Sequence, residues 1–290
     1  MKILDPFFNR FVDIEKNRYA NLEGIRALAI IMVFNVHLFG RFYKDGYYVE
    51  HDLLRNFLKV LHAGHTGVDL FFVLSGFLIF RSLGKVPNLG QFMFKRYHRL
   101  WPVVFVTGIA LFKSMNNSVL TIFDNFSLLM FWTKEPVNYV NWTLTYEVYF
   151  YFFIGLWFFY LQKIKFFKAN GIFLFGLLLI LTFAIVPGHF IQEPYRFIGF
   201  FWGILLAKLH DHGFFLRGIG ALIAKYGWVI AFVGIPILLT WWGVYALASP
   251  FPKSWPTVVT TVLFFMLIEA LYFLLIASIL QKNGLSSRLN

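Results

Sequence analysis

The chain is a succession of long apolar stretches separated by short polar ones. Most of the stretches approach about 20 residues, the length an α-helix needs to cross the hydrocarbon core of a bilayer. Apolar runs lie near residues 22–40, 66–83, 98–113, 142–162, 171–187, 195–210, 227–245 and 257–280. The runs near 98–113, 171–187 and 195–210 are the shortest, and Pro102 and Gly203 permit bends in two of them. The pattern predicts an all-α, polytopic transmembrane helical bundle with about eight spans.

Composition supports the membrane assignment. Hydrophobic residues make up 59% of the chain and charged residues only 14%, and Phe alone occurs 39 times. A soluble domain of this size carries more charge, so that class is excluded. The chain shows no soluble domain, low-complexity tract or short repeat, and we expect a single integral-membrane domain over residues 1–290.

The positions of Lys and Arg predict how the helices are oriented. With a cytoplasmic N-terminus, 18 of the 26 Lys and Arg residues fall on the cytoplasmic side, as the positive-inside rule requires. An even number of spans then puts the C-terminus there too. Residues 1–20 are too charged for the apolar core of a cleaved signal peptide, so a cytoplasmic segment and an uncleaved anchor are expected. Topology and contact with anionic lipid explain the net charge of +12, and no nucleic-acid partner is predicted.

Cysteine is absent from the chain. A disulfide, a thiolate metal site and a cysteine that carries an acyl group are therefore all excluded. His62 and His65 stand three positions apart, but they have no further ligands of known geometry. No metal site is predicted.

The first apolar run contains two ionisable residues, Arg26 and His37, eleven positions apart. Eleven helical steps return to within about 20° of the starting direction and advance about 16 Å, so both side chains share a face with Ile30 and Val33. A charge or imidazole inside a membrane is costly unless it faces protein or water, which favours a functional role. The alternative is an arginine that reaches the interface and a histidine with a structural role.

The second run begins HAGHTGVDLFFVLSGFLIF and places Asp69 just inside the outer boundary of the bilayer, where a carboxylate needs a partner. Ser75 and Gly76 follow near the middle of the membrane. Gly76 predicts close packing against another helix. Ser75 is expected to hydrogen-bond the carbonyl one turn back.

A basic cluster, FMFKRYHRLWP, stands at the entrance of the third run. Arg96 and Arg99 are three positions apart and share a helical face. Two forked guanidiniums side by side suit a phosphate or pyrophosphate. The alternative is a topogenic signal that contacts lipid.

Two glutamates lie in later apolar runs. Glu147, in NWTLTYEVYFYFF, stands one turn beyond Thr143 among aromatic residues. Without a partner, a glutamate in such surroundings would be protonated, because burial disfavours its charged form. A nearby cation or histidine would keep it charged and useful. Glu269 lies deep in the last run and has no supporting motif around it.

Four motifs together resemble the integral-membrane acyltransferase-3 family. They are Arg26 with His37, GVDLFFVLSGFLI over residues 67–79, RYHRLWP over residues 96–102 and NWTLTYEVYFY over residues 141–151. The match covers residues 20–162, and beyond them the likeness is one of hydropathy alone. Members are multi-pass enzymes, mostly bacterial, that O-acylate extracytoplasmic carbohydrates, so the resemblance implies location in a bacterial inner membrane.

The resemblance also implies about ten helices, with a closing pair that contains a histidine and that we do not find. The tail LQKNGLSSRLN resembles the linker before that pair, so we expect a chain that lacks its final helices. Without them, the last two runs would expose a surface to lipid or a partner. Its expected residues are Trp241, Trp242, Phe264, Phe265 and Tyr272.

The predicted orientation assigns roles to the motifs. Arg26, Arg96 and Arg99 fall on the cytoplasmic side, where an acyl-CoA co-substrate, in the first instance acetyl-CoA, presents its phosphates. His37, Asp69 and Glu147 fall in the outer half of the bilayer. A histidine is well matched to removing a proton from an acceptor hydroxyl at neutral pH. We therefore predict that His37 is the general base, that Asp69 or Glu147 orients it, and that the arginines bind the donor; the resemblance implies the same roles.

Two other classes of function stay open at this stage. A secondary transporter also buries charged residues, although it is typically built from two halves of matching hydropathy, which this chain lacks. A non-catalytic membrane partner in polysaccharide assembly would keep the motifs without activity. The acceptor, a carbohydrate or glycolipid, the acyl chain, the oligomeric state and the existence of a covalent intermediate are not fixed by the sequence.

Overall fold

The structure is a computed structural model that describes residues 20–44, 63–110, 122–123, 126–128, 141–164, 171, 176, 193–248 and 255–286. Across these residues it holds seven α-helices and no strand, which confirms the all-α class. The chain divides into two compact units. Residues 1–74 and 208–290 form one of them, the terminal unit, and residues 75–207 form the other, the central unit.

Five helical segments in the described part of the chain are long and apolar enough to cross a membrane. They are Asn21–Phe39, Gly64–Leu83, Trp142–Lys163, Gly218–Trp242 and Val259–Leu280, and each matches a predicted apolar run. The predicted run 195–210 forms a helix of 15 residues, and most of the run 171–187 lies outside the described residues. The chain is thus an integral membrane protein, while the count of eight spans and the orientation stay predictions.

In the terminal unit, helix α2 (Ala20–Lys44) buries Leu22, Ile25 and Ala29 on one stripe. The 3₁₀ turn η1 (Ala63–Thr66) and the start of helix α4 (Gly67–Leu83) contact this helix. A Cβ at Gly67 would lie 2.8 Å from the carbonyl oxygen of Ala29. The glycine is therefore needed for α4 to approach the backbone of α2 so closely.

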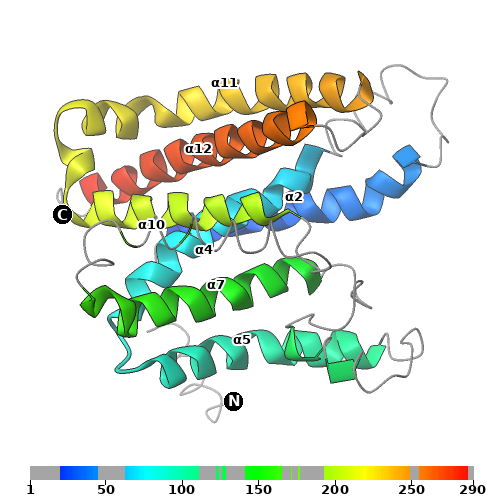
Figure 1. The fold of residues 1–290 in the computed structure, drawn as a ribbon. Coiled ribbons are helices and arrows are strands. Elements are labelled where there is room, and N and C mark those ends of the chain that lie inside the picture. The colour runs from blue at the N-terminus through cyan, green and yellow to red at the C-terminus, as the bar shows by residue number, and fades with distance from the viewer. Residues whose placement is uncertain are drawn as a thin grey trace, which may run out of the picture. The chain divides into compact units, whose positions relative to one another are not determined.

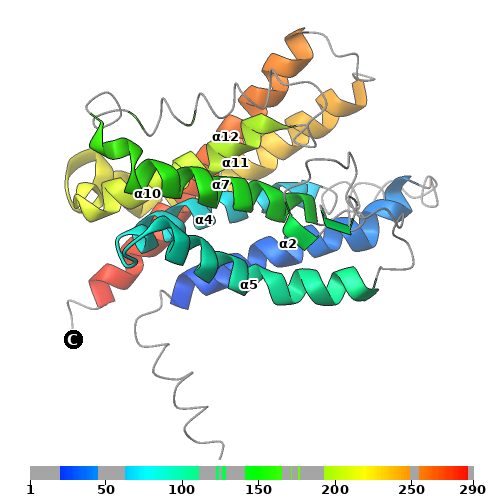
Figure 2. The same ribbon diagram turned by 60° about the horizontal axis from the view of Figure 1, so that its bottom comes forward.

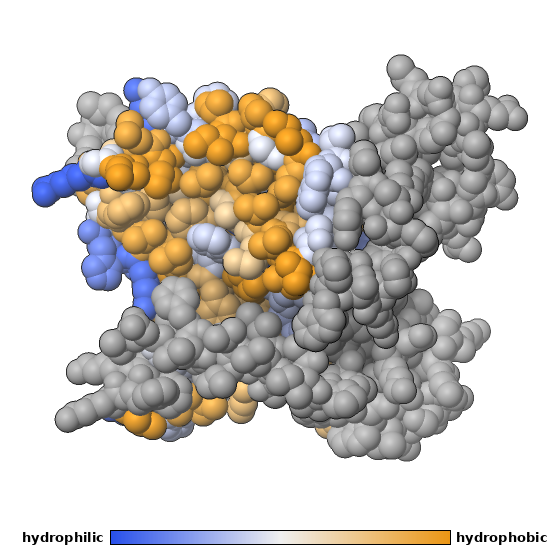
Figure 3. Space-filling model, turned by 45° about the horizontal axis from the view of Figure 1, so that its top comes forward, coloured by the Kyte–Doolittle hydropathy of each residue, from blue (hydrophilic) through white to orange (hydrophobic). Residues whose placement is uncertain are grey.

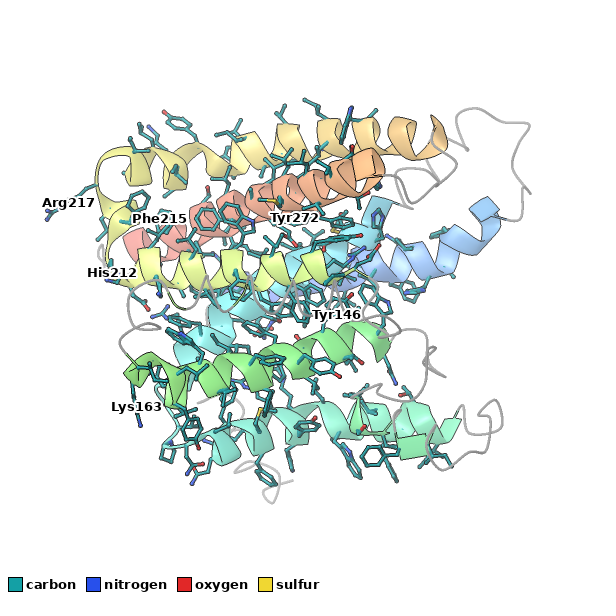
Figure 4. All side chains as sticks on the ribbon, viewed as in Figure 1. Tyr146, Lys163, His212, Phe215, Arg217 and Tyr272 are labelled. Carbon is teal, nitrogen blue, oxygen red and sulfur yellow. The ribbon has the colours of Figure 1, made fainter. Side chains whose placement is uncertain are left out.

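Helices α11 (Gly218–Ala248) and α12 (Trp255–Ser286) complete the terminal unit. They run side by side in both ribbon views (Figures 1 and 2). Trp242 stacks on Phe264 with ring centroids 4.4 Å apart. The backbone N–H of Trp228 donates to Ser278 Oγ at 3.0 Å, and Ser278 Oγ lies 3.3 Å from the carbonyl oxygen of Ile223, so this apolar pair also has polar contacts. Before α11, the 3₁₀ turn η6 (Phe214–Leu216) puts Phe215 against Phe273 of α12, with centroids 6.3 Å apart (Figure 4).

The surface of these two helices corrects one expectation. Phe264, Phe265 and Tyr272 are buried, not open to lipid or a partner, because α2, η1 and α11 lie against α12 or stack on its rings. Trp241 alone of the expected set is clearly exposed. Hydrophobic side chains instead gather over α11 (Figure 3), including Ile219, Phe232 and Ile237. Lipid tails would cover such a face.

In the central unit, the second half of α4 packs against helix α10 (Phe197–Asp211), most of which belongs to this unit. A Cβ at Gly76 would lie 2.1 Å from the carbonyl oxygen of Phe200, so the predicted close packing of Gly76 is confirmed. Phe150 of helix α7 (Trp142–Phe159) stacks on the Phe200 ring with centroids 4.2 Å apart. Two 3₁₀ turns adjoin these helices in the chain: η4 (Leu161–Lys163) follows α7, and η5 (Pro194–Arg196) precedes α10.

Helix α5 (Leu89–Ala110) begins earlier than the predicted run at 98–113 and continues through Pro102. Its start is set by Asn88, whose side-chain oxygen accepts the backbone N–H of Gln91 at 2.9 Å. Asparagine is a favoured residue at this capping position, so the sequence did hold a signal for the true boundary. The consequence is that Arg96 and Arg99 lie inside a helix.

Candidate functional site

A buried carboxylate stands at the centre of the polar contacts in the central unit. Glu147, in the second turn of α7, is 2% exposed. Ser75 Oγ, on α4, donates to Glu147 Oε1 at 2.9 Å. The hydroxyl of Tyr151, one turn further along α7, donates to Glu147 Oε2 at 2.5 Å. Each carboxylate oxygen thus has a hydroxyl donor, as a carboxylate in an apolar interior requires.

The partner of Ser75 corrects another expectation. Ser75 hydrogen-bonds a carboxylate on a different helix instead of the carbonyl one turn back. A charge-assisted hydrogen bond to a carboxylate is stronger than one to a peptide carbonyl, so the tertiary contact prevails. Sequence reasoning missed both Ser75 and Tyr151 as site residues. The available signal was the position of Tyr151 four residues after Glu147, which is the spacing of facing helical side chains.

The basic motif of α5 meets this carboxylate. The guanidinium carbon of Arg96 lies 5.9 Å from the centroid of the Tyr151 ring and 5.3 Å from that of Phe92. Arg96 also donates to Ser82 Oγ, and this hydroxyl donates to the carbonyl of Ile79 at 2.6 Å. The positive charges of Arg99 and Arg96 both act on Glu147. The arginine and glutamate motifs therefore form one site.

The two arginines differ in exposure. Arg96 is half-buried between rings, and Arg99 is exposed. Arg96 thus lies against Tyr151 and Ser82, whereas Arg99 is exposed and so accessible to a phosphate group.

The terminal unit contains a second buried polar cluster. Asp69, in the first turn of α4, is 0% exposed. The hydroxyls of Thr66 and Tyr272 are 2.8 Å apart, and the Asp69 charge acts on Tyr272. Figure 4 marks Tyr272 on α12, where Glu269, one turn earlier, is also fully buried. The N-terminus of a helix favours negative charge, which stabilises Asp69 there.

Arg26 and His37 both lie on α2, which is continuous between them, so their predicted common face is confirmed. Arg26 is half-buried and forms an ion pair with Glu23 at 2.8 Å that the sequence analysis did not foresee. His37 is exposed. The segment that precedes it packs on η1, where a Cβ at Gly64 would lie 3.2 Å from Val36 Cγ2.

The predicted site residues thus fall into two groups. Arg96, Arg99 and Glu147 belong to the central unit, where the charges of both arginines act on Glu147. Arg26, His37 and Asp69 belong to the terminal unit. Of the two histidines considered as a metal pair, His62 lies outside the described residues, and the ring of His65 meets Phe265 edge-on with centroids 6.5 Å apart.

Membrane-spanning helices with buried carboxylates, hydroxyls and arginines define a multi-pass membrane protein with a polar interior site. A family model described as an acyltransferase domain, that of the acyltransferase-3 family, matches residues 19–289. The chain belongs to this family. The match continues well past residue 162, where the resemblance read from the motifs ended.

Three curated relatives are similar to parts of the chain. Acyltransferase MdmB of Streptomyces mycarofaciens is 25% identical over 51% of this chain and 41% of its own length. A putative acetyltransferase of Acidianus two-tailed virus is 26% identical over 53% of this chain and 51% of its own. Peptidoglycan O-acetyltransferase OatA of Listeria monocytogenes is 35% identical over 30% of this chain and 12% of its own.

The chain therefore spans about half the length, or less, of the curated relatives that it matches. No solved structure matches it significantly.

Proposed function

We propose that this chain transfers an acyl group, in the first instance acetyl, from acyl-CoA to a hydroxyl of an extracytoplasmic carbohydrate or glycolipid. Membership of the family supports the reaction class, and two relatives are named as acetyltransferases. The observation that carries the proposal is Glu147, buried in a membrane-spanning helix, hydrogen-bonded by Ser75 and Tyr151 and attracted by two arginines. Ionisable groups kept inside a membrane span are functional by default.

Arg96 and Arg99 are proposed to bind the phosphates of the donor, with Arg26 as a further contact. Guanidiniums recognise phosphate through paired N–H donors. Arg99 is exposed and Arg96 is held against Tyr151, so the first would capture the donor and the second would fix its position. Acyl-CoA is a co-substrate in this scheme, and no resident cofactor or metal is invoked.

His37 is proposed as the general base, oriented by Asp69. Both residues belong to the terminal unit, where Gly64 and Gly67, just before Asp69, contact residues 29–36 of α2. If the acyl group passes directly from acyl-CoA to the acceptor, His37 takes the proton of the acceptor hydroxyl. The oxygen of that hydroxyl attacks the thioester carbonyl. The new ester C–O bond forms and the C–S bond breaks. The departing thiolate then takes the proton from the imidazolium. General-base assistance of this kind contributes about 10²–10⁴ in rate.

The proposed orientation puts both termini in the cytoplasm of a bacterium and the chain in its inner membrane. It rests on the Lys and Arg asymmetry. Reporter fusions after Asn141 and after Lys163, at opposite ends of α7, should report opposite faces, with Lys163 cytoplasmic. A reporter at Lys163 on the outer face would invert the donor and acceptor assignments.

The catalytic proposal is tested by His37→Ala and Arg99→Ala, with His210→Ala and Arg217→Ala as controls on the same residue types. Base-labile acetyl on envelope carbohydrate should disappear in His37→Ala at unchanged membrane expression. Arg99→Ala should mainly raise the KM for acetyl-CoA, because it removes phosphate contacts and leaves the base in place. Normal acetylation in the His37→Ala strain would refute the general-base role.

A further inference from the structure

A second group of polar and aromatic residues lies in the central unit, at the start of α7. Arg196, in η5, is 5% exposed and forms an ion pair with Glu193. The guanidinium carbon of Arg196 lies 5.3 Å from the centroid of the Trp142 ring. The hydroxyl of Tyr146 accepts the backbone N–H of Glu193 at 3.3 Å. Tyr195, also in η5, lies between Glu193 and Arg196 in the chain, and the Glu193 charge acts on it. We call these five residues the α7–η5 cluster.

Some side chains of the α7–η5 cluster are exposed and therefore accessible to a ligand. The Glu193 side chain is 40% exposed, while that of Arg196 is only 7% exposed. Trp142 and Tyr195 are half-buried. Because Arg196 is buried, its desolvation offsets much of the attraction to Glu193, so the ion pair is weak support for stability. A pair held against an aromatic ring, with its carboxylate accessible, is suited to binding a ligand.

The chemistry of the cluster selects the ligand class. Glu193 and Arg196 neutralise one another, so the cluster offers hydrogen-bond acceptors and donors without net charge. Aromatic side chains such as Trp142 and Tyr195 combine a large apolar surface with a polar tip. A neutral sugar ring presents the matching groups: C–H bonds on its faces and hydroxyls on its rim. An anionic ligand would meet the Glu193 carboxylate, which disfavours it.

The α7–η5 cluster adjoins the site described above. Tyr146 directly precedes Glu147 on α7, and Trp142 lies about 7.5 Å before Glu147 along the axis of that helix. Tyr151, against which Arg96 rests, lies on the other side of Glu147 along the same helix. Tyr146 and Lys163 mark opposite ends of α7 in Figure 4. Along α7, the cluster and the arginines thus flank Glu147.

We infer that the α7–η5 cluster binds a neutral sugar ring of the acceptor beside Glu147. This inference rests on the proposed function for its biological meaning, but sugar binding is measurable without turnover. The full chain in lipid nanodiscs would be examined by saturation-transfer-difference NMR with maltotriose and N,N′,N″-triacetylchitotriose as neutral probes. Trigalacturonate serves as the anionic comparison.

Wild type is expected to give signals with at least one neutral trisaccharide and weaker ones with trigalacturonate. Trp142→Leu and Glu193→Gln should each reduce the neutral signal about tenfold, while Trp142→Phe, which keeps a ring, should reduce it less. Trp101→Leu removes a Trp that is 48% exposed on α5 and is the matched control. Each variant would also be checked for monodisperse elution and for acetyl-CoA binding, which a local loss of sugar contacts leaves intact.

Three outcomes overturn the inference: no neutral signal in wild type, an equal signal in Trp142→Leu, or a stronger signal with trigalacturonate. Failure of the proposed function looks different. In that case neutral sugars bind in a Trp142-dependent way, but label from acetyl-CoA never reaches them or the envelope carbohydrate.

Discussion

Each half of helix α4 has a buried carboxylate. The carboxylate of the first half belongs to α4 itself, and that of the second half belongs to another helix. In the terminal unit, Asp69 belongs to α4, and its charge acts on the hydroxyl of Tyr272, which comes from α12. In the central unit the hydroxyl, that of Ser75, belongs to α4, and the carboxylate, Glu147, comes from α7. Both halves also hold a glycine that admits a neighbouring backbone, Gly67 toward α2 and Gly76 toward α10.

We expect the two halves of α4 to affect different steps of the reaction, because their carboxylates act on different residues. Asp69 shares its unit with His37, whereas Glu147 faces Arg96 and Arg99. A carboxylate that acts on a base affects proton transfer, and a carboxylate that acts on donor-binding arginines affects donor binding. The two halves should therefore be separable by kinetics.

The largest effect is expected from Asp69→Asn. If Asp69 orients His37, the substitution should lower kcat by about 10²–10⁴-fold, the range that general-base assistance contributes. The KM for acetyl-CoA should stay close to its wild-type value. Both parameters are measured as label transfer from acetyl-CoA in nanodiscs.

Glu147→Gln is the matched comparison on the other half. It should change the KM for acetyl-CoA more than kcat, because Arg99 and Arg96 lose the charge that they face. The opposite pattern, a loss of kcat in Glu147→Gln alone, would transfer the orienting role from Asp69 to Glu147.

The buried polar residue in the first half of α4 was easier to predict from the sequence than the polar contact in the second half. An aspartate at the start of a membrane helix already signals a buried charge, and the local TGVD pattern positions it. Ser75 carries no such signal, since a serine in an apolar helix can bond its own backbone. Only the packing of α4 against α7 decides that its partner is Glu147.

Packing between distant segments explains the other misses as well. Tyr272 stands 206 residues from Thr66, and no local pattern in α12 announces the contact. Phe264 and Phe265 were expected to be exposed because the closing helix pair that the family resemblance implies was not found. Their burial depends on which neighbours α12 meets, and hydrophobic periodicity cannot supply that for so apolar a helix.

A second, smaller effect is expected from the glycines. Gly76→Ala would bring a Cβ to 2.1 Å from a backbone oxygen, and Gly67→Ala to 2.8 Å. Overpacking of this kind costs about 1–3 kcal/mol or more, so Gly76→Ala should lower the midpoint of thermal unfolding in detergent more than Gly67→Ala. Gly84→Ala is the control, because a Cβ there would meet nothing within 4 Å. Equal midpoints for the Gly76 and Gly84 variants would show that α4 and α10 are not in the contact described.

The smallest predicted effect is the difference in stability between variants of Tyr272 and Tyr151, the tyrosines associated with the first and second halves of α4. Tyr151→Phe removes a hydrogen bond to a carboxylate, which is worth about 1.5–3 kcal/mol, and Tyr272→Phe removes one to a neutral hydroxyl, worth about 0.5–1.5 kcal/mol. The midpoint of thermal unfolding should therefore fall roughly twice as far in Tyr151→Phe. Tyr160→Phe, at an exposed position just after α7, should leave it unchanged.

A double substitution sharpens this last comparison. Thr66→Val combined with Tyr272→Phe removes both hydroxyls of one hydrogen bond, so its effect should be smaller than the sum of the single effects. Ser75→Ala with Tyr151→Phe removes two separate donors from one carboxylate, so its effect should be at least the sum. If both pairs instead behaved alike, Ser75 and Tyr151 would not act as separate donors to Glu147, and the geometry described for the second half of α4 would be refuted.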